Sequence, residues 1–358
     1  MLSSYRLERI PQEPGLQAWN AADELLLKRD IELCTGQILL LNDSFGALAV
    51  TLADKELCWW NDSAMAHDAL KLNCATNQVR LPIVNHQFPE QAEIDTVIMH
   101  LPKSLNFFAW QLEQIQQCLT NTGSVLLLGM VKHISKGHIE LMTRYFSNIN
   151  PGRAEKKARV IQLTDPIPHS ESKASHYAIE SLNTDFTQLP GCFAENNADP
   201  GALVFIDYLK TRANFNAALD LGCGNGVLSV ALTQASQTAA ITLIDESQQA
   251  LNSAKANLCH AKTTNRLRFI HSDGTNALGS DELFDLIVCN PPFHQGFSLT
   301  EKIAHKLFSD AHKHLTSQGE FWVVANRHLP YYSDLKKRFG RVALKSKHPK
   351  FNVYFCQL

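Results

Sequence analysis

Residues 217–226 have the sequence AALDLGCGNG, and this stretch decides the fold. Its first half is a short apolar run that stops at glycine, which is typical of a buried parallel strand. Three alternating glycines then allow a tight turn and let the backbone approach a ligand closely. The next residues, 227–234, favour a helix. Strand, glycine turn and helix in this order predict the first βα unit of an open α/β sheet.

The same alternation continues to the end of the chain. Further strands are expected at 241–244, 267–271, 283–289 and 321–325, with two more near Val342 and Val353. Helices are expected at 247–259, 300–315 and 331–339. Alternating strands and helices predict a parallel sheet with helices on both faces.

The first half of the chain carries a weaker copy of this pattern. Four segments align in the same order, at offsets that grow from 180 to 196 residues: 41–48 with 221–228 (LNDSFGAL, LGCGNGVL), 62–63 with 245–247 (DS, DES), 95–102 with 285–292 (DTVIMHLP, DLIVCNPP) and 123–126 with 319–322 (GSVL, GEFW). Such a series indicates an internal repeat of one domain. We expect domains at 1–164 and 201–358, joined by a polar, proline-containing linker at 165–200 that can hold a hairpin of its own.

A second motif, Asn290-Pro291-Pro292-Phe293, ends the fourth predicted strand of the second copy. Two prolines fix backbone dihedrals and remove two amide donors. Nearby carbonyls and the Asn290 side chain are then free acceptors at the edge where open α/β sheets bind ligands. Phe293 is placed to stack on a planar group, although a core phenylalanine in a strand-ending turn would give the same residue.

Two aspartates follow the next predicted strands. Asp245 comes 23 residues after Gly222, where an acid meets ribose hydroxyls in dinucleotide sites, and Asp273 follows the third strand. Helix caps and turns also use aspartate. Their place at successive strand ends favours contact with a cofactor.

Composition limits the class of protein. The chain has 358 residues, 45% of them hydrophobic, and a net charge of −2, so no overall basic excess indicates nucleic acid. Nine cysteines without a Cys-x-x-Cys pair favour free thiols over disulfides or a metal site. Neither a signal peptide nor a run of roughly 18 apolar residues is present, so we expect a cytoplasmic protein.

These motifs resemble those of class I S-adenosylmethionine-dependent methyltransferases, whose domains are Rossmann-like. Residues 220–226 resemble their motif I, and 290–293 resemble motif IV of the enzymes that methylate exocyclic amines. Two tandem domains, the first degenerate, resemble the RlmG/RsmC family of ribosomal RNA guanine-N2 methyltransferases, with the large-subunit branch nearer. The likeness covers most of the chain and is carried by 16–24, 41–48, 290–295 and 324–329. It is weakest at 193–201, where Phe193, Asp199 and Gly201 match but Glu195 replaces the usual arginine.

The resemblance implies S-adenosyl-L-methionine as the cofactor and the N2 amine of a guanine in 23S ribosomal RNA as the methyl acceptor. The glycine loop would hold the methionine moiety, Asp220 would orient the loop or the cofactor amine, Asp245 would meet the ribose, and Asp273 the adenine. The implied cofactor-binding residues are Asp220, Gly222, Cys223, Gly224, Gly226, Asp245, Asp273 and Asn290; the implied catalytic residues are Asn290, Pro291, Pro292 and Phe293. Asn290 and the Pro291 carbonyl would accept hydrogen bonds from the amine, whose lone pair is otherwise delocalised into the ring.

Local basic runs fit an RNA partner. Residues 336–350 contain seven lysines and arginines and no acid, and 153–159 form a second cluster. A solvated face would give similar runs, but both clusters fit phosphate contacts. The expected substrate-binding residues are Phe293, His294, Lys336, Lys337 and Arg338.

The first copy lacks the glycine loop and the Asn-Pro-Pro-Phe motif, since it has Asn42 and Ser44 in place of glycines and His100 in place of Asn290. We expect it to contact RNA or to support the second domain, and we expect a monomer with an internal pseudo-dimer. Alternatives are a 16S guanine-N2 methyltransferase, a methyltransferase of adenine N6, cytosine N4 or protein glutamine, a nicotinamide-dependent dehydrogenase, and a non-enzymatic RNA-binding assembly factor. The glycine spacing and the Asn-Pro-Pro-Phe motif disfavour the dehydrogenase.

Overall fold

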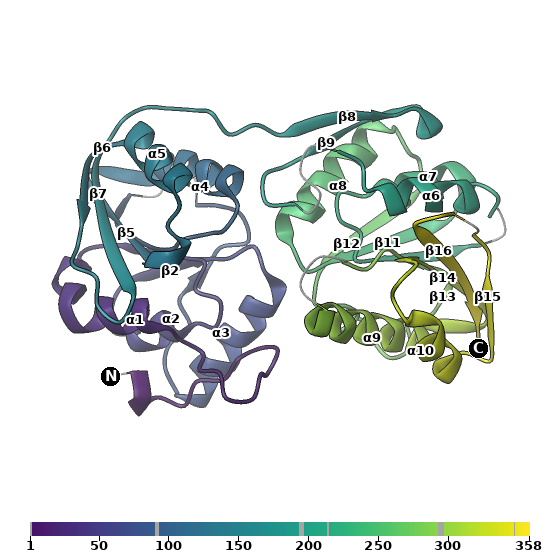
Figure 1. Cartoon of the computed structure of the whole chain (residues 1–358), viewed down its shortest axis with the longest axis horizontal. Helices are drawn as coiled ribbons and strands as arrows, with labels where there is room; N and C mark the ends of the chain where they lie inside the picture. The colour runs from purple at the N-terminus through teal and green to yellow at the C-terminus, as the bar shows by residue number, and fades with distance from the viewer. Residues whose placement is uncertain (1, 90–92, 193–196, 213–214, 293–296, 347) are drawn as a thin grey trace. The chain divides into compact units, whose positions relative to one another are not determined.

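A computed structural model describes residues 2–89, 93–192, 197–212, 215–292, 297–346 and 348–358, without the side chains of 297–301. The chain forms two compact units, Met1–Lys173 and Ala174–Leu358 (Figure 1). No helix in the described ranges is long and apolar enough to cross a membrane. No group of three metal-ligating side chains comes together among the described residues.

The first unit contains a seven-stranded sheet in the order β3-β2-β1-β4-β5-β7-β6. Its strands are β1 (Ile38–Leu41), β2 (Leu57–Trp60), β3 (Ile83–Val84), β4 (Ile94–His100), β5 (Leu119–Met130), β6 (Phe146–Pro151) and β7 (Ala158–Pro166). Strand β7 is antiparallel to β5 and β6, and the other pairs are parallel. The helices are η1 (Leu2–Ser4), α1 (Ala21–Leu25), η2 (Leu26–Asp30), η3 (Ile31–Leu33), α2 (Ala47–Thr51), α3 (Ala64–Thr76), α4 (Leu105–Cys118), η4 (Val131–His133) and α5 (Lys136–Tyr145).

The second unit repeats this sheet, in the order β12-β11-β10-β13-β14-β16-β15. Its strands are β10 (Ala217–Leu221), β11 (Ala240–Asp245), β12 (Arg266–His271), β13 (Phe284–Cys289), β14 (Leu315–Asn326), β15 (Arg341–Leu344) and β16 (Phe351–Gln357). The helices are η5 (Glu180–Leu182), α6 (Pro200–Leu209), α7 (Val227–Ala235), α8 (Gln248–His260), α9 (Phe297–Lys313) and α10 (Tyr331–Arg338). The identical strand order confirms the predicted repeat of one α/β domain. We call the edge where the parallel strands end the carboxyl edge and the opposite one the amino edge.

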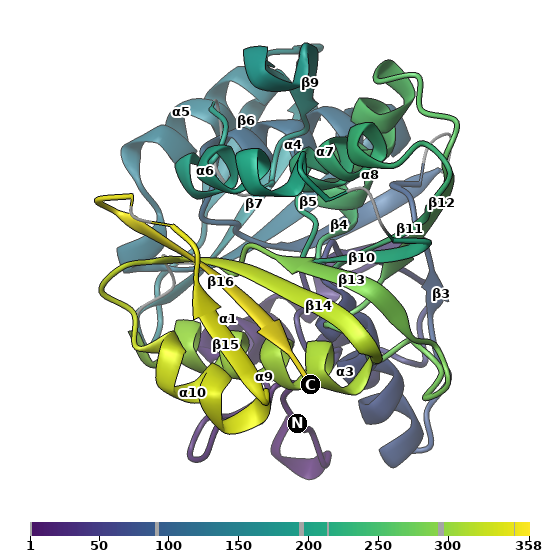
Figure 2. The ribbon, with the colours of Figure 1, turned by 90° about the vertical axis from the view of Figure 1, so that its right-hand side faces the viewer.

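Each central strand is buried on both faces, which explains its unbroken apolar sequence. In β10, Ala218 packs into a cluster with α6, α7 and α8, whereas Leu219 and Leu221 pack into a second cluster with α9 and α10. All three side chains are completely buried. Figure 2 shows these helices on the two sides of the second sheet.

Much of the segment expected to be a linker is folded into the second unit. Strands β8 (Ser175–Ile179) and β9 (Thr184–Gln188) pair as an antiparallel hairpin. Ile179, Leu182 and Phe186 are buried in the core cluster beside α6. The pairing confirms the hairpin expected in this stretch, whose composition is polar because only one face of the hairpin packs against the core.

The repeat extends to a bracing asparagine in each unit. Asn73 on α3 exchanges two hydrogen bonds of 2.8 Å with the Glu8 backbone, and its amide also donates to the Phe45 carbonyl at 2.8 Å. Asn257 on α8 makes the same three contacts, to the Thr187 backbone at 2.7 and 2.8 Å and to the Asn225 carbonyl at 2.8 Å. Both side chains are completely buried. Each unit therefore includes the segment that precedes its sheet, and the hairpin is that segment in the second.

Candidate active site

The glycine loop leaves the carboxyl edge of β10 in an open conformation. Gly222, Gly224 and Gly226 all have positive φ angles, of 75°, 54° and 83°. A Cβ atom on Gly222 or Gly224 would meet nothing within 4 Å, whereas one on Gly226 would lie 3.0 Å from the Ala254 Cβ. Gly226 therefore lets α7 approach α8, and the other two glycines leave free space where a ligand can approach the backbone.

Asp245, at the end of β11, holds this loop in place. Its carboxylate accepts hydrogen bonds from the Gly224 amide at 2.7 Å and from the Ser247 amide at 2.9 Å. The Gly222 and Cys223 amides both donate to the Ile244 carbonyl at 2.9 Å. A carboxylate at this edge is also a possible acceptor for a ligand hydroxyl. Burial raises the pKa of the adjacent Cys223 thiol well above its usual range, so this thiol is neutral.

Asp220 supplies a buried acceptor beneath the loop. It is completely buried, and the Ser229 hydroxyl donates to its Oδ2 at 2.6 Å. Its Oδ1 has no hydrogen-bond partner in the described parts of the chain. Burial raises the pKa of Asp220 to about 7, although the Ser229 hydrogen bond opposes this. An unpaired buried oxygen of this kind is a place where a polar or cationic ligand group would be stabilised.

Asn290 follows β13, directly beside the glycine loop. Strands β10 and β13 are parallel neighbours with Leu221 opposite Cys289, so Gly222 and Asn290 leave the sheet side by side. The Asn290 amide donates from Nδ2 to Asp199 Oδ1 at 3.0 Å. Its own Oδ1 is buried and has no partner among the described residues. Pro291 is buried and Pro292 half-buried, while Phe293 and His294 lie outside the described residues.

Asp273 is also at the carboxyl edge, two residues after β12 ends. It is half-exposed, and its carboxylate lies 3.7 Å from the Lys306 Nζ atom. Lys306 also donates to the Asp273 backbone carbonyl at 2.9 Å and to Asp310 at 2.7 Å. The structure therefore brings Asp220, the glycines, Asp245, Asp273 and Asn290 to one edge of the sheet.

The predicted basic residues lie elsewhere. Lys336, Lys337 and Arg338 form the last turn of α10, and β15 then begins at Arg341 opposite Gln357, which is the amino edge. Arg338 is also paired with Asp334 at 3.3 Å. The structure thus does not bring this cluster to Asn290.

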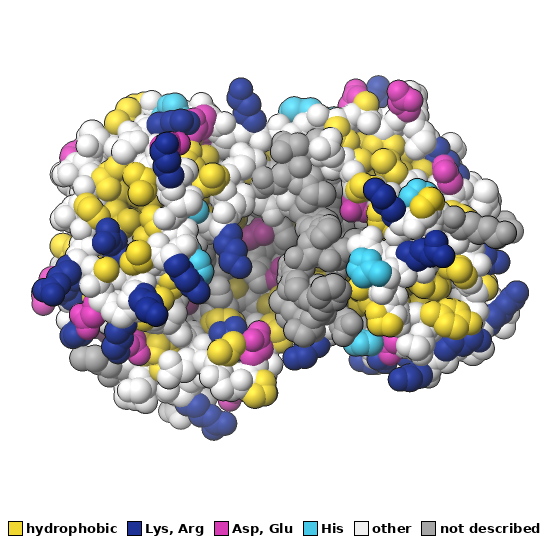
Figure 3. Space-filling model, in the orientation of Figure 1, with side chains coloured by type: hydrophobic (Ala, Val, Ile, Leu, Met, Phe, Trp, Pro, Cys, Tyr) yellow, Lys and Arg dark blue, Asp and Glu magenta, His cyan; other side chains and the backbone are white. Residues whose placement is uncertain are grey.

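Two other residues of the basic run 336–350, Lys345 and Lys350, do lie near the site, together with Arg327, which sequence reasoning did not single out. The pairing of β14 with β16 places Asn326 opposite Phe351 at the carboxyl edge, and the Arg327 amide donates to the Lys350 carbonyl at 2.9 Å. The exposed residues Arg327, Lys345 and Lys350 lie around this end of β14 and β16; we call them the site-edge cations. Only the antiparallel pairing reveals this grouping. Figure 3 shows how widely lysines and arginines are otherwise spread over one face of both units.

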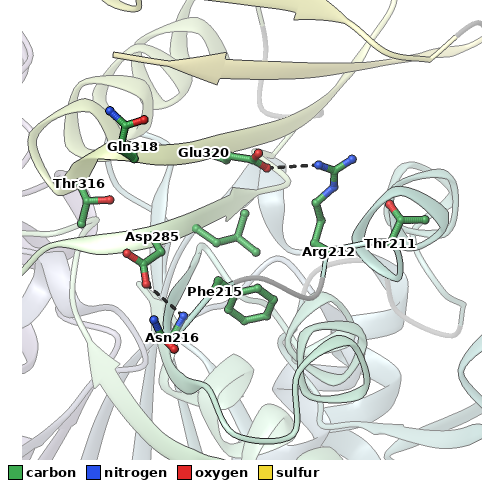
Figure 4. A pocket seen from close by; sticks show the side chains of 9 residues that line it. Thr211, Arg212, Phe215, Asn216, Asp285, Thr316, Gln318 and Glu320 are labelled. Carbon is green, nitrogen blue, oxygen red and sulfur yellow. Dashed lines mark hydrogen bonds and ion pairs between the residues drawn. The ribbon is translucent and has the colours of Figure 1, made fainter.

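A pocket at the amino edge is separate from this site. It is lined by residues that precede or begin β10, β13 and β14, among them Arg212, Asn216, Asp285 and Glu320 (Figure 4). Arg212 pairs with Glu320 at 3.5 Å, and the Asn216 amide donates to Asp285 at 3.0 Å. The charged side chains that line this pocket therefore already have partners within it.

The corresponding edge of the first unit is built differently. The buried Asp43 carboxylate accepts from the Ala47 and Ala49 amides at 3.1 Å, and so occupies the turn that the glycines leave open in the second unit. His100, aligned with Asn290, has its Nε2 2.6 Å from Asp23. Burial raises the pKa of Asp43 to about 6. Burial by itself would lower the pKa of His100, but the neighbouring Asp23 carboxylate outweighs it and raises that pKa to about 9.

Known protein families match both units of the chain. The family described as the methyltransferase small domain matches residues 183–355, and the RLMG N-terminal domain matches residues 2–166. A solved structure, described as the T. thermophilus 16S rRNA N2 G1207 methyltransferase (RsmC) in complex with AdoMet and guanosine, superimposes with a TM-score of 0.77 at 22% identity. The match covers 96% of this chain and 94% of that one. This likeness confirms the predicted fold of two tandem methyltransferase-like domains.

Two curated relatives match nearly the whole chain. Ribosomal RNA large subunit methyltransferase G of Magnetococcus marinus is 37% identical over 97% of this chain and 95% of that protein. The protein of the same name from Shewanella amazonensis is 36% identical over 97% of this chain and 94% of its own length. The chain therefore belongs to the ribosomal RNA large subunit methyltransferase G family.

Proposed function

We propose that this protein transfers the methyl group of S-adenosylmethionine to the exocyclic N2 amine of a guanine in large-subunit ribosomal RNA. One observation carries the proposal: an open glycine loop and the Asn290 amide lie at adjacent strand ends, and the amide oxygen is buried without a partner among the described residues. The names of the relatives support the RNA substrate, and the ligands bound in the T. thermophilus structure support the cofactor and the base.

The carboxyl edge of the second unit fits this cofactor. Gly222 and Gly224 provide space beside the backbone, and the unpaired Asp220 oxygen would accept from a cationic amine. Asp245, which holds the loop at this edge, would accept from ribose hydroxyls, and Asp273 would accept from the adenine amino group. S-adenosylmethionine, when bound, supplies an electrophilic methyl group on its sulfonium.

Asn290 would prepare the acceptor. Its Oδ1 can accept one N–H of the guanine amine, which draws the nitrogen lone pair out of conjugation with the ring. Because this acceptor is fixed before the base arrives, no reorganisation is needed as charge develops. The Pro291 carbonyl would accept the second N–H. Phe293 remains the predicted stacking residue for the base.

The RNA would approach over the carboxyl edge. The exposed site-edge cations lie at the same edge as Asn290 and would contact phosphates around the target base. The first unit, whose own edge is occupied by Asp43 and the His100–Asp23 pair, would support the second or add RNA contacts. We expect the enzyme to act as a monomer, in the cytoplasm where ribosomes are assembled.

Nucleoside mass spectrometry of ribosomal RNA tests this function. RNA would be compared from cells with the gene, cells without it, and cells complemented by Asn290→Ala. We expect N2-methylguanosine to be lost from the large-subunit RNA without the gene and not restored by the variant. Loss from small-subunit RNA instead, or loss of a methylated adenine, would replace the proposed substrate by that one.

A further inference from the structure

Asp199 makes a contact that none of the roles above uses. It precedes α6, and its Oδ1 accepts from the Ala202 amide at 2.8 Å as the cap of that helix. The same oxygen accepts from the Asn290 Nδ2 at 3.0 Å, across 91 residues of chain. The start of α6 is thereby joined directly to the end of β13.

This contact decides which end of the Asn290 amide faces the substrate. A carboxylate can only accept hydrogen bonds, so the NH2 group of the amide must face Asp199. The amide oxygen must then face the other way, and it is the buried atom that lacks a partner among the described residues. A rotated amide would present donors to the guanine amine, which is itself a donor, and the acceptor would be absent.

Asp199 is itself held by its neighbours. Pro200 occupies the first turn of α6, where its fixed φ angle suits a helix start. A Cβ atom on Gly201 would lie 3.0 Å from the Asp199 Oδ1 and 3.3 Å from the Phe351 ring. Glycine at 201 therefore leaves room for the carboxylate between the helix start and β16.

The first unit has a related contact in the same place. Helix α1 precedes β1 as α6 precedes β10, and Asp23 in its first turn reaches His100 at the end of β4. In both units, a carboxylate at the start of this helix thus contacts a residue at the carboxyl end of the fourth strand: the last residue of β4, or the residue after β13. In the second unit, the contact leaves the Asn290 Oδ1 without a partner among the residues that the structure describes.

We propose that Asp199 is a positioning residue, which fixes the Asn290 amide so that its oxygen faces the guanine amine. This rests on the proposed function of Asn290. Asp199 acts through Asn290 and not on the cofactor, so its removal should lower kcat and leave cofactor affinity unchanged.

The variants separate positioning from helix capping. Asp199→Ser keeps a good helix cap but is too short to hold Asn290, whereas Asp199→Asn keeps an oxygen that can accept from both groups. In the full chain, we expect Asp199→Ser to lower kcat by on the order of tenfold or more, part of the effect of losing a preorganised polar group. Asp199→Asn should keep most of the wild-type kcat. Calorimetric affinity for S-adenosylmethionine and the melting temperature should hardly change in either variant.

A double-mutant cycle with labelled cofactor and ribosomal RNA gives the deciding result. In the Asn290→Ala background, Asp199→Ser should have no further effect on kcat, because the group it positions is gone. An equal decrease in both backgrounds, or wild-type kcat in Asp199→Ser, would overturn the positioning role. Absence of guanine-N2 product from the wild-type chain would reject the proposed function instead.

A spectroscopic measurement tests the contact without activity. The side-chain amide signal of Asn290 can be assigned in a ¹⁵N-labelled chain by its disappearance in Asn290→Ala. We expect that signal to shift in Asp199→Ser and to stay near its wild-type position in Asp199→Asn. A signal that Asp199→Ser leaves in place would show that Asp199 does not hold the amide.

Discussion

The two carboxyl edges of this chain belong to sheets with the same strand order, and they differ in what occupies the turn after the first central strand. In the second unit, the Gly222–Gly226 loop leaves open space, and oxygens of Asp220 and Asn290 are buried without partners among the described residues. In the first, Asp43 fills the turn by capping α2, and His100 is paired with Asp23. One nitrogen of His100 stays unpaired in the described part of the chain, but both carboxylates there are engaged.

What both edges keep is as informative as what differs. Gly46 and Gly226 have similar positive φ angles, of 71° and 83°, and a Cβ on either would come within about 3 Å of the next helix, at Leu70 or Ala254. These glycines allow two helices to pack closely, which explains why the first unit has Gly46 although it lacks the open glycine loop. The fold alone therefore does not carry function, which depends on a few side chains at the strand ends.

The largest expected difference concerns turnover. Asn290→Ala should lower kcat on ribosomal RNA by on the order of 10², the scale for losing one preorganised polar group, with cofactor affinity nearly unchanged. The matched change in the first unit, His100→Asn, should leave kcat within about twofold. Steady-state kinetics at a temperature where both variants are folded measures this. Near wild-type kcat for Asn290→Ala would disprove the proposed amine activation.

The next difference concerns stability and pH. Because the pKa of His100 is raised from 6.5 to about 9, its ion pair stabilises the fold fully below pH 6.5, and this stabilisation is lost as the pH rises through 9. The free energy of unfolding of the first unit should fall over this range by roughly 1–3 kcal/mol. Asp43, with a pKa of about 6, is mostly deprotonated before this window and should add little.

Tryptophan fluorescence can follow this unfolding. Four of the five tryptophans, Trp19, Trp59, Trp60 and Trp110, belong to the first unit. Denaturant titrations across the pH range should show the decline for the wild type and a much flatter profile for His100→Asn. If both chains showed the same slope, a different group would be responsible.

The smallest expected difference is in RNA affinity. Reversing the charges of the site-edge cations should weaken RNA binding and lower its salt slope by about one for each phosphate that the protein no longer neutralises. Reversing Lys336, Lys337 and Arg338, at the amino edge, should also weaken binding but less, since those residues lie away from Asn290. Filter binding over a range of salt concentrations compares the two. A larger effect from reversing Lys336, Lys337 and Arg338 would indicate that the RNA binds along the amino edge instead.

The sequence predicted the features that depend on short stretches of chain. The apolar runs identify the central strands because those strands are buried on both faces, and the glycines identify the turn because only glycine adopts its conformation easily. The contacts that complete the site are not local. Asp199 reaches Asn290 across 91 residues, and Lys350 reaches Arg327 only through the pairing of β14 with β16. The polar segment at 165–200 predicted a hairpin, but not that the hairpin packs into the second unit, because only Ile179, Leu182 and Phe186 of it are buried in that core.

A calorimetric titration of the full chain with S-adenosylmethionine tests most directly the claim that one of two similar units carries the cofactor site. We expect one molecule bound per chain. Gly224→Ala should weaken binding by on the order of tenfold or more, because a side chain at this positive φ angle costs roughly 1–2 kcal/mol and enters the free space. The aligned change Ser44→Ala should leave affinity unchanged. Two molecules bound per chain, or binding that survives Gly224→Ala and fails in Ser44→Ala, would contradict that claim.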